Sequence, residues 1–325
     1  MFKSKKHSHL SIELRDYVIR ALLMKGPGLV QSQLFEIPLK NGTIVESVIE
    51  DEMTLFDIFK KYASKWGGKK QNVRLFVPDT SVLLKTFEHP EDVESDKLLE
   101  YVQMELGESI RVPFEDPLVD VYDHVPHDGQ AVIFAAPSDE ISKLTSLFLD
   151  IKMEPEVADI RSLCNLRLLE KIGYLDGERT YLVADWSINE LSICIYSLGQ
   201  VEFLRFQTIE TDLHKWAATI ESEQEVQFSL QGDSQGYLMQ VMDEVLELDR
   251  MMNFFRYSLH KGEKGVDEII VMGDNPFLEQ ITETLNNNLV VPSKMVTDEV
   301  IAKHFPNFKG KHAALLGLAL KEVHP

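Results

Sequence analysis

The sequence has few cysteines, no long apolar run and a shortage of positive charge. Only Cys164 and Cys194 are present, each among apolar residues, which is typical of buried thiols and implies no disulfide framework. No window approaches the roughly 18 consecutive apolar residues of a membrane-spanning helix, and no apolar signal segment follows the charged N-terminus. Lys plus Arg number 33 against 53 Asp plus Glu, a net charge of -20 that repels nucleic acid phosphates. We therefore expect a soluble cytoplasmic protein that binds no nucleic acid and does not insert into the membrane.

Several common catalytic motifs are also missing. The sequence contains no G-x-x-x-x-G-K-[ST] phosphate loop and no G-x-S-x-G nucleophile elbow. His124 and His127 share a segment without a third ligand or a cysteine beside them, so we predict exposed imidazoles and no metal site.

Charge is unevenly distributed along the chain. The basic opening Lys3-Ser4-Lys5-Lys6-His7 is shorter than the usual lipid-contacting pattern of four or more bases beside an apolar segment. The acidic run from Glu88 to Glu100 indicates either a solvated helix face or a surface that attracts a basic peptide tail.

The hydrophobic pattern predicts two lobes that open in the same way. Residues 9–36 and residues 181–206 each read as three short strands separated by turns, and the first set is followed by a helix over 53–66 and a strand over 73–78. Such a duplicated β-meander is the organisation of actin-like folds. A helix over 238–259 carries a stripe with methionines, which fits either a buried lobe helix or an adaptable groove. A final helix is expected over 312–323.

We predict an α/β protein with the two-lobed actin-like ATPase (ribonuclease H-like) fold and an inserted αββα subdomain. Residues 1–87 would begin the first lobe, residues 88–150 would form the insert, residues 151–178 would return to the first lobe, and residues 179–325 would form the second lobe.

Dispersed short motifs resemble the type IV pilus assembly protein PilM family, a relative of the division protein FtsA. No single motif is specific, but their order and spacing are. They are Ile12-Glu13-Leu14, Val77-Pro78 with Val82 and Lys85, Glu105-Leu106 leading to Ile110-Arg111-Val112-Pro113-Phe114, Phe134-Ala135-Ala136-Pro137, Pro155-Glu156-Val157-Ala158-Asp159, Ala184-Asp185, Phe203-Leu204-Arg205, residues 248–257, residues 269–273, and residues 313–320.

The resemblance implies an ATP-binding, actin-like protein at the inner face of the plasma membrane that holds the cytoplasmic tail of the membrane protein PilN. The chain departs from the family at the expected nucleotide site. Glu13 stands for Asp, Arg15 for Gly, Asp185-Trp186-Ser187 for Asp-x-Gly, and Gly273-Asp274 for Gly-Gly. Glycine lets backbone N–H groups close around a phosphate, so these changes argue against ATP binding.

Two of the replaced residues allow alternative interpretations. In an actin-like cleft Glu13 and Asp185 would face a magnesium-bound phosphate from opposite lobes. Arg15 could bridge these two carboxylates and occupy the phosphate position, or it could be an exposed arginine in a β-turn. Trp186 could plug the cleft or belong to a core.

The resulting prediction is a scaffold of the type IV pilus or a related secretion machine, without ATP hydrolysis and with no required cofactor. It would retain Glu13, Arg15, Asp185 and Gly273 as remnants of a site for ATP and magnesium. A PilN-like single-pass membrane protein would attach it to the membrane, and other pilus platform proteins would join it. The resemblance implies a groove between the first lobe and the insert, so the tail of the PilN-like protein would dock near Val82, Leu84, Val119, Val121 and Phe134, about half of which strand alternation assigns to the core. The alternative is an active actin-like ATPase or sugar-kinase-like enzyme. A third alternative is an FtsA-like filament with its own membrane anchor, but residues 320–325 offer no amphipathic extension.

Overall fold

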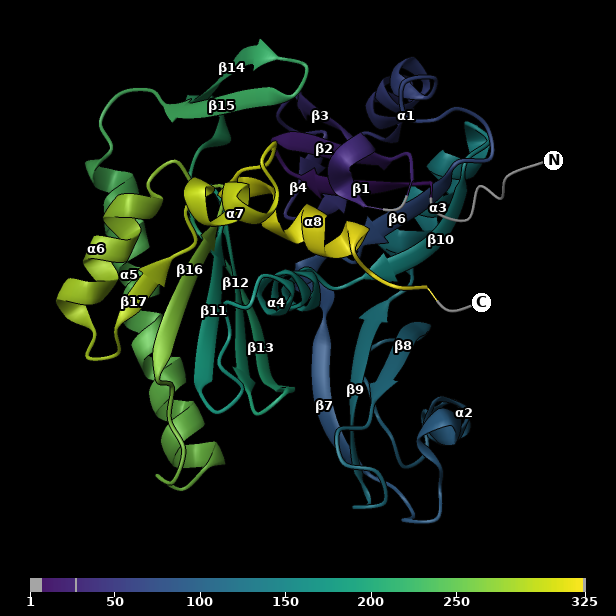
Figure 1. The fold of residues 1–325 in the computed structure, drawn as a ribbon, viewed down its shortest axis with the longest axis vertical. Coiled ribbons are helices and arrows are strands. Elements are labelled where there is room, and N and C mark those ends of the chain that lie inside the picture. Colours follow the sequence, from purple (N-terminus) through teal and green to yellow (C-terminus); the bar gives the residue numbers. More distant parts are fainter. Residues whose placement is uncertain (1–7, 27, 324–325) are drawn as a thin grey trace.

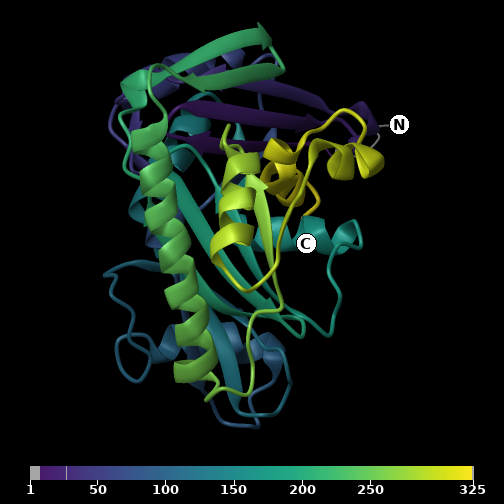
Figure 2. The same ribbon diagram turned by 90° about the vertical axis from the view of Figure 1, so that its left-hand side faces the viewer.

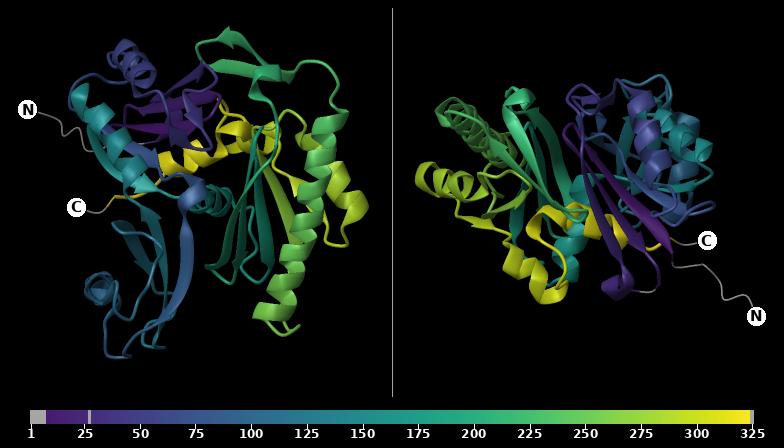
Figure 3. Two further views of the ribbon diagram at one scale, coloured as in Figure 1. Left: turned by 180° about the vertical axis from the view of Figure 1, so that it is seen from behind. Right: turned by 90° about the horizontal axis from the view of Figure 1, so that it is seen from above.

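Two five-stranded sheets face each other across a pair of central helices (Figure 1). A computed structural model describes residues 8–26 and 28–323, so the basic opening at residues 3–7, Pro27 and the last two residues lie outside it. The central helices are α4 (Arg161–Lys171) and α8 (Ala313–Ala319), and they share one apolar core with both sheets. Figure 3 shows from above that α8 lies between the lobes.

The first-lobe sheet contains the predicted meander of antiparallel strands. The first two strands of the meander are almost entirely buried on both faces. In order across the sheet its strands are β10 (Glu154–Asp159), β6 (Asn72–Phe76), β1 (His9–Arg15), β2 (Val18–Met24) and β3 (Gln33–Pro38). Helices α1 (Glu52–Tyr62) and α3 (Asp139–Asp150) cover its outer face. The short strands β4 (Ile44–Val45) and β5 (Val48–Ile49) pair between β3 and α1.

The second-lobe sheet repeats this antiparallel meander and then adds parallel strands. Its order is β13 (Gln200–Thr208), β12 (Glu190–Ser197), β11 (Thr180–Trp186), β16 (Glu268–Gly273) and β17 (Ser293–Met295). Helices α5 (Gln235–Asn253) and α6 (Leu278–Asn288) cover its outer face, and α5 runs along the length of the lobe (Figure 2). Met251 and Met252 of α5 are buried, so this stripe belongs to a lobe core.

A third sheet forms the inserted subdomain at the lower end of the first lobe (Figure 1). It has the order β7 (Leu83–Glu88), β9 (Gln130–Pro137) and β8 (Pro117–Tyr122), and α2 (Leu98–Glu105) packs on one face. The boundaries differ from the prediction at both ends. β7 pairs with β9 and so belongs to the insert, whereas α3 buries its apolar stripe against the first lobe.

Several elements were not predicted from the sequence. The hairpin of β14 (Trp216–Ser222) and β15 (Glu225–Leu230) extends from the second lobe towards β3, to which the Glu223 carbonyl is hydrogen-bonded. Helix α7 (Asp298–His304) and strand β10 were also missed. The last helix ends at Ala319, earlier than the predicted residue 323.

The two central helices approach each other closely at Gly317. A Cβ atom at this position would lie 1.9 Å from the Cys164 carbonyl oxygen of α4, a distance that no side chain tolerates without backbone movement. The glycine therefore sets the distance between α4 and α8.

Replacing Gly317 with alanine is expected to lower the free energy of unfolding by about 3 kcal/mol through overpacking. Gly236 near the start of α5 has open space around its Cβ position, so Gly236→Ala is the matched control and should be neutral or slightly stabilising. Urea unfolding of both variants measures the difference. Equal stability of the two variants would show that the helix contact relaxes without cost.

Candidate functional site

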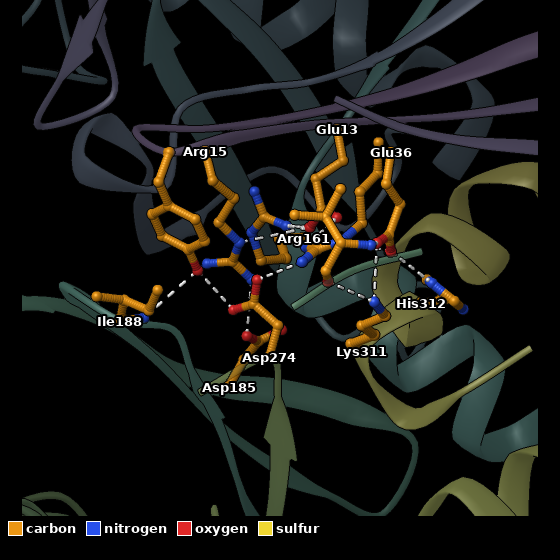
Figure 4. Close-up of polar contacts among 12 residues, drawn as sticks. Glu13, Arg15, Glu36, Arg161, Asp185, Ile188, Asp274, Lys311 and His312 are labelled. Atoms are coloured by element: carbon orange, nitrogen blue, oxygen red, sulfur yellow. Dashed lines mark hydrogen bonds and ion pairs between the residues drawn. The ribbon is translucent and has the colours of Figure 1, made fainter. Parts of the chain in front are cut away.

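Strand register places three charged residues side by side at the cleft between the lobes. Glu13 pairs with Arg20 across β1 and β2, and Arg20 pairs with Glu36 across β2 and β3. Arg20 is almost fully buried, and its Nη1 lies 3.1 Å from Glu13 Oε2 while its Nε lies 3.2 Å from Glu36 Oε1. Its Nη2 lies 2.6 Å from Asp274 Oδ2 of the second lobe. One guanidinium thus joins three carboxylates from two lobes, those of Glu13, Glu36 and Asp274, which are labelled in Figure 4.

Arg15 makes the second connection between the lobes. Its Nη2 lies 2.9 Å from Asp185 Oδ1 and its Nη1 lies 3.4 Å from Glu190 Oε2, both in the second lobe. Its Nε lies 3.5 Å from Glu13 Oε1. The side chain is 3% exposed, so of the two interpretations of Arg15 the structure has the bridging one.

The N-terminus of α4 completes the arrangement. Arg161 pairs with Glu13, and its Nε lies 2.6 Å from Asp79 Oδ2 at the end of β6. Asn165 Nδ2 donates to Asp185 Oδ2 at 2.7 Å. We call the resulting set the interlobe ion cluster; its members are Glu13, Arg15, Arg20, Glu36, Asp79, Arg161, Asp185, Glu190, Asp274 and Lys311.

The two hairpin turns that would hold phosphates in an actin-like ATPase contact each other directly. Asn189 Nδ2, in the turn between β11 and β12, donates to Asp16 Oδ2 in the turn between β1 and β2 at 2.8 Å. The Tyr17 hydroxyl donates to Asp274 Oδ1 at 2.7 Å and accepts the Ile188 N–H at 3.4 Å. Side chains therefore occupy the space between the turns.

Gly273 and Trp186 have structural roles at this position. Gly273 has a φ of +119°, and a Cβ there would lie 2.1 Å from the Trp186 carbonyl oxygen. That oxygen accepts the N–H groups of Asp274 and Asn275 at 3.0 and 3.1 Å. The Trp186 side chain is completely buried in the second-lobe core and does not plug the cleft.

Three carboxylates of the cluster, those of Glu13, Glu36 and Asp274, have a pKa below the usual range and are held in the charged form. Burial by itself would raise the pKa of Glu13, but the guanidiniums of Arg161, Arg20 and Arg15 outweigh it and lower that pKa. Burial likewise opposes ionisation of Asp274, whose pKa is lowered by Arg20 and Arg15. Ion pairing thus offsets the desolvation of these buried charges.

Glu36 connects the first lobe to the hairpin and to the C-terminal segment. Besides Arg20, its carboxylate accepts Lys311 Nζ at 2.8 Å and the Val226 N–H at 2.6 Å. His312 Nδ1 accepts the Lys309 N–H at 3.0 Å, so Nε2 carries the proton donated to Glu36 at 2.9 Å. Burial lowers the pKa of His312, which fits this neutral tautomer, and despite burial these donors hold the pKa of Glu36 well below its usual range.

Glu190 differs from Glu13, Glu36 and Asp274 in the direction of its pKa shift. Burial raises its pKa to about 7, with Asp16 adding to the shift, although Arg15 opposes it. Its other oxygen accepts Ser47 Oγ at 2.9 Å. The cluster has four cationic and six carboxylic side chains, so it offers no surplus positive charge to a phosphate.

A cavity of about 570 Å³ opens on the other side of Gly273 and Asp274. The hairpin β14–β15, the N-terminus of α6 and the segment around Lys309 and Lys311 line it. Arg20 reaches this cavity from the cluster, but its guanidinium is already paired with three carboxylates.

Two adjoining cavities of about 280 and 330 Å³ lie between the insert and the lobes. They share Asp120, Phe134 and Leu163, and we call them together the lobe–insert groove. The groove is bounded by β8, β9, α4 and the β12–β13 turn of the second lobe. Within the described residues β8 pairs only with β9, so its outer edge is available to a further strand.

The structure brings together part of the predicted docking set. Val82, Val119 and Phe134 line one half of the groove, and Val121 and Phe134 line the other. Leu84 lines neither half and packs against the core between the lobes, opposite Phe134. The side chains of Val119 and Val121 pack into the insert core, because alternation along β8 turns them towards α2.

Sequence reasoning missed several members of the ion cluster. Arg20, Glu36, Arg161, Glu190 and Lys311 were not singled out. A signal was present for the first two, because each interrupts an otherwise apolar strand, and a charge inside a buried strand requires a partner. No local pattern marks Arg161 or Lys311, since only the tertiary fold brings them to Glu13 and Glu36.

Structural comparisons define the class of protein first. A PilM-PilN type IV pilus biogenesis complex superimposes with a TM-score of 0.73 at 17% identity, covering 98% of this chain and 99% of that chain. A Bacteroides thetaiotaomicron protein with an actin-like ATPase fold gives 0.52 at 13% identity, covering 98% and 97%. Spiroplasma citri MreB5 bound to ADP gives 0.51 at 11% identity, covering 97% and 95%. The predicted actin-like ATPase fold is thus confirmed.

The family follows from the sequence profile of type IV pilus assembly protein PilM, which matches residues 16–322. The chain belongs to this family. No curated protein matches it by sequence. Within the described residues, no helix is both long and apolar enough to cross a membrane.

The raised pKa of Glu190 predicts a specific pH dependence of stability. A carboxyl group whose folded pKa exceeds its unfolded value keeps its proton longer in the folded state, so stability falls as pH rises from about 4.5 to about 7. Glu190→Gln should remove this loss, which amounts to up to about 3 kcal/mol above pH 7. Urea unfolding of wild type and variant between these pH values measures it. Parallel stability curves would contradict the assignment.

Proposed function

We propose that this chain is a scaffold of the type IV pilus, or a related secretion, inner-membrane assembly platform. It binds the cytoplasmic tail of a PilN-like single-pass membrane protein and does so without ATP hydrolysis. The protein is held at the inner face of the plasma membrane through that partner, alongside other platform proteins. Membership of the PilM family and the likeness to a PilM-PilN complex support this role.

One observation carries the non-catalytic part of the proposal, namely the position of Arg15. Its guanidinium lies between Glu13 and Asp185, the two carboxylates that would otherwise face a magnesium-bound phosphate. Phosphate binding would require breaking buried, charge-assisted contacts, and it would leave carboxylates from both lobes without their cation. The contact between the hairpin turns also occupies the Ile188 N–H, a backbone donor that a phosphate in this position would need.

The lobe–insert groove supports the binding part of the proposal. Its floor is apolar, with Phe134, Ala136 and Leu163, and an edge strand runs along one side. An extended tail gains backbone hydrogen bonds from such an edge and fills pockets with alternate side chains. Leu118 and Tyr122 of β8 are 40% and 43% exposed and line the groove, so their apolar surface is available to a bound peptide.

Nucleotide binding is the second candidate function, and the cavity of about 570 Å³ beside Gly273 is the observation that favours it. In this alternative the cavity would receive a nucleotide and the ion cluster would open to admit its phosphates. Each function has its own test.

Millimolar Mg-ATP is expected to leave the thermal unfolding midpoint unchanged. A competent ATPase at 100 times its dissociation constant would gain about 2.7 kcal/mol, which raises the midpoint by several degrees. Differential scanning fluorimetry with and without magnesium measures the shift. A magnesium-dependent rise accompanied by phosphate release would refute the scaffold without hydrolysis and favour the ATPase.

Leu118→Asp is expected to weaken binding of the cytoplasmic tail of the PilN-like protein from the same organism at least tenfold. The substitution places a charge in the apolar groove, and each tenfold loss of affinity corresponds to about 1.4 kcal/mol. The side chain is exposed, so folding should be unaffected, unlike Val121→Asp, which would disrupt the insert core. Fluorescence anisotropy with a labelled tail peptide measures the affinity.

Met104→Asp is the matched control for the groove, because Met104 is 73% exposed on α2 of the same insert and does not line either cavity. It should bind the peptide like the wild type. Equal affinity of all three proteins would exclude the lobe–insert groove as the tail site.

A further inference from the structure

Lysines gather at the upper outer corner of the first lobe, away from the lobe–insert groove. Residues 60–70, which end α1 and form the following turn, contain five lysines and no acidic residue. They are Lys60, Lys61, Lys65, Lys69 and Lys70, and all are exposed. Exposed Lys152 joins them, because its carbonyl accepts the Lys70 N–H at 2.7 Å. We call these six residues the lysine corner.

The lysine corner is largely without counter-charges. Among the described residues, Lys65 pairs with Glu223, whereas the other five form no ion pair. Lys60 and Lys61 instead lie over the rings of Phe56 and Tyr62, at 5.7 and 5.6 Å. Exposed Asp57, Asp150 and Glu154 lie nearby in sequence but form no ion pair with these lysines.

The described part of the chain begins at the same corner. Ser8, the first described residue, has its Oγ 3.3 Å from Gln71 Oε1, immediately after Lys69 and Lys70. The seven residues before Ser8 contain Lys3, Lys5 and Lys6 and no acidic residue.

The rest of the molecule is acidic, and the acid is concentrated at the opposite end. Residues 88–128 of the insert contain thirteen acidic and two basic residues, a net charge of -11 in a chain of net charge -20. The insert and α1 lie at the two ends of the first lobe (Figure 1). Because charges more than about 8 Å apart in physiological salt are largely screened, the corner retains a positive local potential.

We propose that the lysine corner contacts the anionic surface of a membrane. The clustered cations are all lysines, the compact ammonium charges that suit diffuse lipid phosphates, and none of them lines the cavities between the lobes or beside the insert. The contact is peripheral and orients the protein with the acidic insert turned away from the lipid. It rests on the proposed function, which places the chain at a membrane through its partner, and it adds a second attachment point.

Vesicle sedimentation of the full chain tests this contact. The variant Lys60→Glu/Lys61→Glu/Lys69→Glu removes three of the cations, and Lys215→Glu/Lys261→Glu/Lys303→Glu makes the same charge change at three exposed lysines elsewhere. With phosphatidylglycerol vesicles at about 50 mM salt, wild type and control should bind and the corner variant should bind about 100-fold more weakly. Binding should be lost at about 300 mM salt and with phosphatidylcholine vesicles.

Absence of wild-type binding at low salt, or equal loss in both triple variants, would overturn the proposal. The acidic insert of a second copy is the competing occupant. If it bound the lysine corner, the wild-type protein would form salt-sensitive oligomers in the absence of vesicles, and the corner variant would not. Detection of such oligomers by sedimentation velocity would also overturn the proposal. Anisotropy with the tail peptide separates the two claims, because the corner variant should keep wild-type peptide affinity even if vesicle binding fails.

Discussion

Two buried arginines hold this structure together, because carboxylates from both lobes depend on them for charge compensation. Arg20 serves Glu13, Glu36 and Asp274, and Arg15 serves Asp185, Glu190 and Glu13. Removing one partner from a buried ion pair costs about 3–5 kcal/mol, since the remaining charge stays desolvated. The lobes therefore meet through contacts that the chain supplies itself. In an actin-like ATPase the nucleotide and its metal would lie at this position, so the same contacts that join the lobes argue against that ligand.

The ion cluster also explains the conformation of elements with little packing of their own. The β14–β15 hairpin exposes much of β14 and would be marginal in isolation. It is fixed by the Val226 N–H and by Lys311, both of which reach Glu36. The tight contact of α4 with α8 at Gly317 places Arg161 beside Glu13, and the C-terminal segment brings Lys311 and His312 to Glu36. A body whose two lobes are joined by ion pairs in this way suits a platform that presents a groove.

The lysine corner and the lobe–insert groove lie apart on the surface, which fits attachment of the protein at more than one point. The lobe–insert groove lies beside the acidic insert, and the lysine corner lies at the other end of the first lobe. The basic opening by itself fell short of a lipid-binding pattern. Only folding brings Lys152 beside the lysines that follow α1.

The sequence by itself determined the repeated strands and the loss of the phosphate-contacting glycines. Runs of alternating polar and apolar residues, or of apolar residues alone, specify buried strands locally. Glycine is required wherever a backbone must close on a ligand. Only the tertiary structure decided which charges pair. Arg15 and Asp185 are 170 positions apart, and their contact depends on how two sheets pack against α4 and α8. The tertiary structure also decided that β7 joins the insert and that α3 does not, and it turned Val119 and Val121 towards α2. Strand pairing at a sheet edge and the direction of side chains on a half-buried strand depend on what packs against each face.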